Sequence, residues 1–331
     1  MNATPAESTT PYDPSAPTDL PPVEPPSAGF IVQLFVIPAV IVVVVVIVWL
    51  LFGKLAGGER DAMSYVETMK SPSANWRAAF ELSSLIRNDP KLARDPRLLG
   101  ELAALLDQDL NLKTDEKLLQ YLAYSLGTFQ TLEAVSGTGQ KVDVIAVLCR
   151  AFEDSRPAEV RIAAGVSLAE QAARLDGTLD DPRAVKALAA VKDTDATEVR
   201  KIAAYALGFF GGSDAAAALK AAIDDPDRDV RYNAALALGR RDDLAALGSF
   251  REMLSDKALE FLYKDTPVAE RSAKIESLEL EALNSLGISA GKGKHALLDA
   301  LRPEVDLLTR SGLATVRSRA QEVLKTLPDA K

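Results

Sequence analysis

The stretch DPDRDVRYNAALALGRRDD occupies Asp225–Asp243, and its centre is the ten-residue motif VRYNAALALG that begins at Val230. Nearly the same motif, VRKIAAYALG, begins 31 residues earlier at Val199. Self-similarity at an interval of roughly 20 to 50 residues is typical of stacked repeat units. This stretch therefore predicts an array of repeats in place of one closed globule.

Further copies become visible when the motif is numbered from its first residue as positions 1 to 10. The seven candidate copies begin at Trp76, Leu118, Val160, Val199, Val230, Leu278 and Val316. Successive starts are 42, 42, 39, 31, 48 and 38 residues apart. Second apolar segments, such as DPRLLGELAALLD and DPRAVKALAAVKD, lie between the copies. Each unit is therefore predicted to be helix, turn, helix and loop, so that residues 61–331 form an all-α domain of about seven helix pairs.

The residue pattern of the motif supports a helix. Positions 1, 5, 8 and 9 are apolar or small in nearly every copy, which places them on one helical face. Alanine recurs at position 5, where we expect two helices to approach closely. The turns before the motif are rich in Asp and Pro, which favour helix starts. Gly at position 10, as in Gly127, Gly208, Gly239 and Gly287, predicts a left-handed residue that ends the helix.

The string D-x-D-x-x-V-R-x-x-A-A-x-A-L-G, which residues 195–243 match closely, resembles the HEAT repeat, in the short form shared with phycobilisome bilin lyases. The resemblance covers most of residues 60–331, and is weaker at Trp76, Leu118 and Leu278. It implies a right-handed α-solenoid of the HEAT or armadillo type. This fold hosts many unrelated binding roles, so the resemblance says little about function.

Arginine at position 2 of the motif has two explanations. It could form a row of anion-binding cations, or it could link neighbouring repeats. The resemblance implies the second role, in which each arginine pairs with an Asp of a neighbouring repeat. The arginines concerned are Arg77, Arg161, Arg200, Arg231 and Arg317.

The first 60 residues have a different composition. Residues 1–29 contain eight of the 18 prolines, four acids and no Lys or Arg, which predicts a disordered, proline-rich tail. Residues 30–52 form an uncharged apolar run of 23 residues. As a helix this run would be about 35 Å long, enough to cross a bilayer. We therefore expect a transmembrane helix over residues 30–52, followed by a short linker over residues 53–60. A cleaved signal peptide is disfavoured because its basic n-region is missing.

The distribution of charge gives the expected orientation. Lys54, Arg60, Lys70 and Arg77 follow the apolar run, and no base precedes it. The positive-inside rule places the repeat domain in the cytoplasm and the tail outside, at a bacterial inner membrane. Beyond residue 29 the chain holds 43 of the 47 acids and all 38 bases. This acidic balance, with no basic block, argues against nucleic acid as a partner.

The sequence shows no convergent set of catalytic residues. His295 is the single histidine and Cys149 the single cysteine, which excludes histidine-rich metal sites and intrachain disulfides. Deoxyhypusine hydroxylase, a HEAT-repeat enzyme, uses several His-Glu pairs that this chain lacks. The segment GISAGKGKHA at Gly287–Ala296 has the wrong spacing for a phosphate loop. We therefore expect no enzyme activity, no cofactor and no metal, and expect Cys149 to be packed in the core.

The leading hypothesis is a membrane-anchored scaffold that binds protein partners at the cytoplasmic face. The alternatives are a bilin lyase-like or other enzymatic relative, and a purely structural envelope protein. The longest interval, from Val230 to Leu278, indicates an insertion around residues 261–279, and insertions in repeats often lie on the binding face. The candidate partner-binding residues in this predicted loop are Tyr263, Lys264 and Arg271. A tolerated surface insertion without function is the other explanation.

Overall fold

The computed structural model describes residues 29, 33, 37–56, 62–71, 76–112, 115–153, 155–175, 179 and 181–327, with side chains of the first helix given up to Val48. The chain divides into two compact units, Met1–Glu59 and Arg60–Lys331. The predicted tail over 1–29 lies outside the described residues except for Gly29. The predicted linker over 53–60 is in part helical, because the first helix continues to Ala56.

The first unit contains helix α2, Ile37–Ala56, with the sequence IPAVIVVVVVIVWLLFGKLA. The valine and isoleucine side chains from Val40 to Val48 are 44–59% exposed. Within the described part of the chain, no helix meets the combined length and apolarity needed to cross a membrane. The predicted span over 30–52 lies partly outside those residues.

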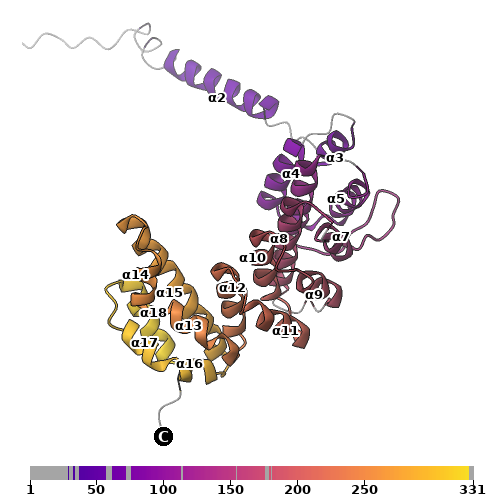
Figure 1. Cartoon of the computed structure of the whole chain (residues 1–331). Coiled ribbons are helices and arrows are strands. Elements are labelled where there is room, and N and C mark those ends of the chain that lie inside the picture. Colours follow the sequence, from indigo (N-terminus) through magenta and orange to yellow (C-terminus); the bar gives the residue numbers. More distant parts are fainter. Residues whose placement is uncertain are drawn as a thin grey trace, which may run out of the picture. The chain divides into compact units, whose positions relative to one another are not determined.

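The second unit is built from α-helices joined by turns and two short 3-10 helices (Figure 1). Its helices are α3 Ala62–Lys70, α4 Trp76–Asn88, α5 Pro96–Asp109, α6 Glu116–Thr128, α7 Val144–Ala151, α8 Ala158–Arg174, α9 Pro182–Ala189, α10 Thr197–Leu207, α11 Gly212–Ala222, α12 Arg228–Gly239, α13 Leu247–Met253, α14 Asp256–Leu262, α15 Val268–Gly291, α16 Ala296–Ala300, α17 Arg302–Leu308 and α18 Ala314–Leu324. Among the described residues, extended pairing is confined to an isolated bridge between Val135 and Lys141. The prediction of an all-α repeat fold is confirmed.

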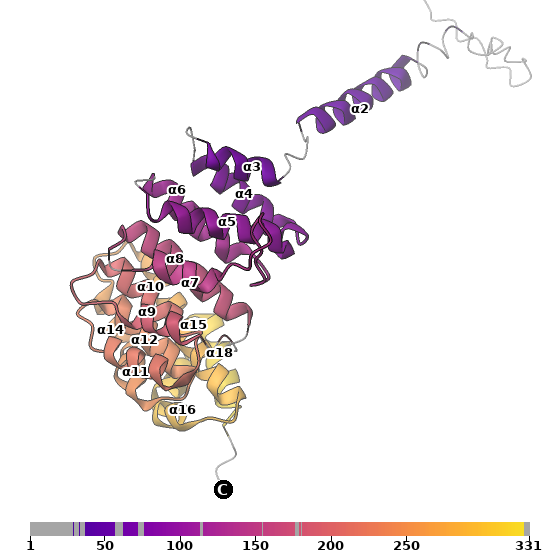
Figure 2. The same ribbon diagram turned by 90° about the vertical axis from the view of Figure 1, so that its right-hand side faces the viewer.

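All seven copies of the motif lie in helices that pack on one another in sequence order. These motif helices are α4, α6, α8, α10, α12, α15 and α18. Within the second unit they form an arc, and α4, α8, α10, α12 and α15 follow its inner side (Figure 1). Helices α5, α7, α9 and α11 cover the outer side, which faces the viewer in Figure 2. The repeat therefore produces a curved stack with a concave face.

The position 5 alanines lie where successive motif helices meet. Ala164, Ala234, Ala282 and Ala320 are fully buried, and Ala203 nearly so. The first copy departs from this pattern, because Phe80 at position 5 is 49% exposed while the preceding Ala79 is fully buried. The first copy therefore aligns with the others when it is shifted by two residues, which puts Ala78 and Ala79 at positions 5 and 6. A side chain as large as Phe80 does not fit a close helix contact, and the helix turns Ala79 inward.

The explanation of the position 10 glycines was also wrong. Gly208 has a φ of −62°, and Gly127, Gly239 and Gly287 lie within helices. Among the described glycines, positive φ occurs at Gly139, Gly212 and Gly293. The glycines are instead sites of close approach: a Cβ on Gly208 would lie 2.5 Å from Nη2 of Arg240. The absence of a side chain, and not a left-handed conformation, is what the packing requires.

The segment predicted as an inserted loop, residues 261–279, is mostly helical. Helix α14 ends at Leu262, a turn follows, and Pro267 precedes α15, a helix of 24 residues. The residues from Val268 to Ser277 extend α15 before its motif copy begins at Leu278. These added residues, VAERSAKIES, include several good helix formers and no Gly or Pro. The extra residues in the interval from Val230 to Leu278 therefore lengthen helix α15.

Candidate functional site

Two of the position 2 arginines form bidentate ion pairs with the following repeat. Arg161 donates to both carboxylate oxygens of Asp195, at 2.7 and 3.3 Å. Arg200 contacts both oxygens of Asp225, at 2.8 and 3.1 Å. The hydrogen bond from Arg161 holds the pKa of Asp195 below its usual value. Each Asp lies in the turn before the next motif helix, so these arginines fix the geometry between repeats.

The other three position 2 arginines have different surroundings. Arg231 donates to the carbonyl oxygen of Asp225 at 2.9 Å, and Arg317 to that of Ser311 at 2.6 Å. The guanidinium of Arg77 lies 5.6 Å from the ring centroid of Trp76. Since the first copy is shifted by two residues, Arg77 is not equivalent to the other four. The structure does not bring the five arginines together as an anion-binding row.

The predicted partner-binding residues Tyr263, Lys264 and Arg271 lie at the turn between α14 and α15. Arg271 donates to the carbonyl oxygens of Lys264, at 2.7 Å, and Thr266, at 3.0 Å. It also contacts the Glu260 carboxylate at 3.2 Å. Arg271 therefore holds the turn closed. The ammonium of Lys264 lies 4.9 Å from the Phe261 ring, and the Phe261 side chain is 72% exposed.

A groove that the sequence did not predict lies on the concave face between α10, α12 and α15. Its volume is about 500 Å³. The side chains that characterise it are Tyr205, Phe209, Leu236, Arg240 and Ile288. A second hollow, of about 390 Å³, continues past the ends of these helices and shares Phe209, Arg240 and Ile288 with the groove. Together they form one surface, here called the concave groove.

Arg240 is the central cation of the concave groove. Its guanidinium lies 5.5 Å from the ring centroid of Phe209, and this ring contacts Tyr205 edge to face at 5.0 Å. Burial is the main cause that lowers the pKa of Arg240, and the positive charge of the neighbouring Arg241 lowers it further. No carboxylate in the described part of the chain forms an ion pair with it. The site therefore presents a half-buried cation next to aromatic rings.

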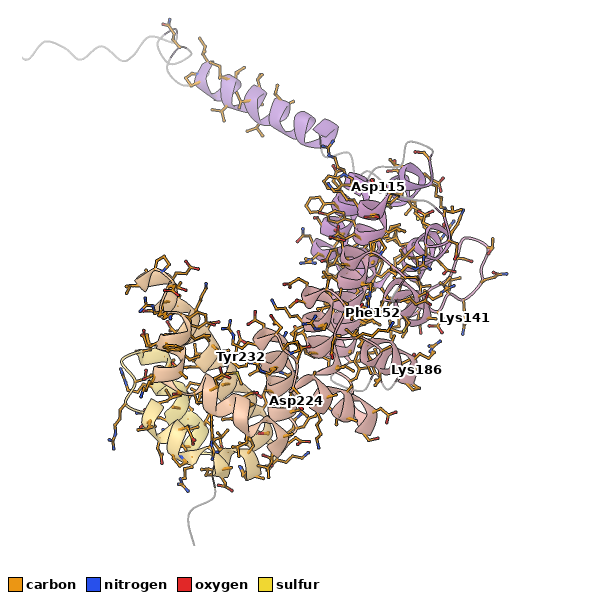
Figure 3. The ribbon with its side chains drawn as sticks, in the orientation of Figure 1. Asp115, Lys141, Phe152, Lys186, Asp224 and Tyr232 are labelled. Carbon is orange, nitrogen blue, oxygen red and sulfur yellow. The ribbon has the colours of Figure 1, made fainter. Side chains whose placement is uncertain are left out.

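A second aromatic group lies on α4 and α6, where Trp76 and Tyr121 are half-buried and Phe80 is exposed. Trp76 stacks on Tyr121 with ring centroids 5.2 Å apart, and Phe80 contacts Tyr121 edge to face at 5.6 Å. The ammonium of Lys117 lies 5.5 Å from the Trp76 ring. These aromatic side chains lie on the first two motif helices. Lys141 and Lys186, which are labelled in Figure 3, instead project from the outer side.

One buried acid occupies a position where other copies carry arginine. Glu279 is position 2 of the sixth copy, and its side chain is fully buried. Neither of its carboxyl oxygens has a hydrogen-bond partner within the described residues. Burial, followed by the neighbouring carboxylates of Asp256 and Glu276, raises its pKa to about 9. Glu279 is therefore protonated at neutral pH.

A metal site, a reactive thiol and a phosphate loop each place their own requirements on the described residues. Among them no group of three or more His, Cys, Asp and Glu side chains could hold a metal ion. Burial raises the pKa of the half-buried Cys149 thiol to about 11, which disfavours the reactive thiolate. The amide of Ala296, which ends the GISAGKGKHA segment, and that of the following Leu297 donate to the Asp242 carboxylate at 2.9 and 2.7 Å. Within this segment Gly287–Gly291 ends α15, and residues 292–295 form the turn to α16.

Comparisons with known proteins agree with the repeat fold. Residues 166–239 and 187–279 match the family described as HEAT repeats. A search of characterised protein sequences found no match.

Three solved structures are similar to this chain at low identity. The complex of CpcE and CpcF of phycocyanin lyase from Nostoc sp. PCC7120 is 17% identical with a TM-score of 0.45, and the match covers 82% of this chain and 96% of that one. An engineered protein is 18% identical with a TM-score of 0.38, over 81% and 96% of the two chains. Human deoxyhypusine hydroxylase in complex with glycerol is 18% identical with a TM-score of 0.27, over 83% and 98%. At these values the likeness carries no argument about activity.

Proposed function

We propose that this protein is a helical-repeat scaffold that binds protein partners along its concave face. The observation that carries the proposal is the concave groove, where apolar side chains stay in contact with solvent beside Arg240. Tyr205 is 46% exposed and Ile288 is 43% exposed. Aromatic and arginine side chains are the residue types that contribute most to protein interfaces.

The repeat architecture supports the same conclusion. Each motif helix buries its alanine stripe against its neighbours, which leaves its remaining face to line the inside of the arc. A stacked array needs no catalytic residue to use such a surface for binding. The lyase alternative has no comparable support, because no feature of the described residues favours it over a scaffold.

The membrane anchor belongs to the proposal as well. Helix α2 has no charged residue before Lys54, and its apolar side chains are exposed around the whole helix from Val40 to Val48. A helix that is apolar on every side is suited to a lipid environment. The bases that follow the apolar run, and none that precede it, place the repeat domain on the cytoplasmic side in this proposal.

Site-specific photo-crosslinking tests the binding function. A photoreactive phenylalanine analogue in place of Tyr205 reports on the concave groove, and the same analogue in place of Asp214, exposed on α11, is the matched position on the outer side. We expect crosslinks from native membranes to one or a few proteins at position 205 and not at 214. Equal crosslinking at both positions, or none at 205, would refute binding by the concave face.

A further inference from the structure

We propose that the concave groove binds an acidic, apolar peptide segment of a partner protein, with a carboxylate of that segment paired to Arg240. This inference rests on the proposed scaffold function and names the chemistry of the partner. The groove lies between α10, α12 and α15 and holds a cation, two aromatic rings and the exposed aliphatic side chain of Ile288.

The position of the Arg240 guanidinium is set by its surroundings. Arg240 follows α12, and its side chain crosses toward α10, where Nη2 lies against the backbone of Gly208. The Phe209 ring centroid lies 5.5 Å from the guanidinium carbon. A guanidinium that packs against a backbone and an aromatic ring loses little conformational freedom when it binds a carboxylate.

The other charged groups of the groove leave Arg240 as the main anion-binding group. Arg241 donates to the carbonyl oxygens of Leu207, at 3.2 Å, and Phe210, so it closes the end of α10. Lys292 is exposed at the rim of the second hollow and adds positive charge there. Glu281 lines the groove on α15, where it accepts a hydrogen bond from Ser277 at 3.4 Å. The end of the groove near Arg240 is therefore positive.

A carboxylate suits this environment because it can accept two parallel hydrogen bonds from one guanidinium. The apolar part of the ligand would contact Tyr205, Leu236 and Ile288. An extended peptide with an acid beside apolar residues supplies both kinds of contact in a short length. The acidic balance of the chain beyond residue 29 disfavours a polyanion such as nucleic acid as the occupant.

Peptide selection tests the proposal directly. A random 12-residue peptide library displayed on phage is selected against the full-length protein in nanodiscs, and in parallel against Arg240→Gln and Arg302→Gln. Arg302, on α17, is an exposed arginine outside the groove and is the matched control. We expect peptides enriched in Asp or Glu beside apolar residues from the wild type and the control, and loss of this enrichment with Arg240→Gln.

Affinity measurements then separate the charge pair from a loss of folding. For the best selected peptide, fluorescence anisotropy should show a loss of about ten- to a hundredfold for Arg240→Gln, and a similar loss when the acid of the peptide is replaced by its amide. The two changes together should cost no more than either alone. Gly208→Ala provides a second variant, because its Cβ would displace the guanidinium without removing it.

The outcomes are distinguishable from a failure of the proposed function. No acidic enrichment, or equal affinity of wild type and Arg240→Gln with unchanged helical content, overturns the inference. If crosslinking at position 205 persists in Arg240→Gln, the scaffold function stands and the assignment of an acidic partner is wrong. If crosslinking at 205 is absent in the wild type, the scaffold function itself fails.

Discussion

Glu279 gives the sharpest test of the energetics of this fold. Its side chain is fully buried, and its pKa is about 9 in the folded state against an ordinary value of 4.5. Between these two pH values the folded protein holds a proton that the unfolded chain releases. Stability must therefore fall as pH rises through this interval, and it levels off above pH 9.

The size of the effect follows from the same two values. Each pH unit within the interval costs about 1.4 kcal/mol, so the loss at pH 7 relative to low pH is about 3 kcal/mol. Replacing Glu279 by Gln removes the titration and keeps the shape of the side chain. The absolute stability of Glu279→Gln also depends on the buried amide, but the slope of stability against pH does not. The difference between variant and wild type should grow by about 4 kcal/mol from pH 5 to pH 8.

Urea unfolding at pH 5, 6, 7 and 8, in one detergent and at constant ionic strength, measures this difference. Glu281→Gln is the matched control, because Glu281 is exposed on the same helix and should leave the slope unchanged. Parallel stability curves for Glu279→Gln and wild type across this range would refute the assignment of a buried, protonated acid. A steeper fall for the variant than for the wild type would contradict the sign of the argument.

Three further predictions concern packing, ion pairing and topology. Ala234→Phe should overpack the contact between motif helices and lower stability by about 1–3 kcal/mol in thermal or urea unfolding, and an unchanged midpoint would contradict the close approach at position 5. Arg200→Ala should cost about 3 kcal/mol because it leaves the carboxylate of Asp225 without its partner, whereas the exposed Arg302→Ala should change stability by less than about 0.5 kcal/mol. Protease added to intact spheroplasts should remove the first ~29 residues and spare the repeat domain. Loss of the repeat domain under those conditions would reverse the proposed orientation.

The fold was predictable because its main determinant is periodic. Val199 and Val230 begin two copies of the same motif. The spacing of most copies, near 40 residues, leaves room for a second helix and two turns. The alanines at position 5 are buried where neighbouring motif helices pack, so the repeated alanine indicates this contact in the sequence itself. The first copy departs from the consensus, so its alignment was not fixed in this way, and Phe80 was placed at a contact that Ala78 and Ala79 make.

The candidate site was less predictable because it depends on which residues of different repeats meet. Tyr205, Arg240 and Ile288 belong to three different copies of the repeat, yet they line one groove. The predicted site at Tyr263, Lys264 and Arg271 was chosen from the length of an interval. That length turned out to extend α15, and Arg271 serves the turn before it.

A sequence signal for the groove does exist at position 11, the residue that directly follows the ten-residue motif. Gly127 and Gly208 occupy position 10, and a Cβ on either would meet the long side chain at position 11 of the next copy, Glu170 or Arg240, at 2.6 and 2.5 Å. The glycine of one repeat therefore makes room for the position 11 side chain of the following repeat. Because position 11 does not belong to the buried stripe, it is free to vary without cost to the stack. Position 11 is the acid Glu170 on α8 and the base Arg240 directly after α12. The repeat that builds the fold therefore leaves the position 11 side chains on the concave face free to determine which partner chemistry binds there.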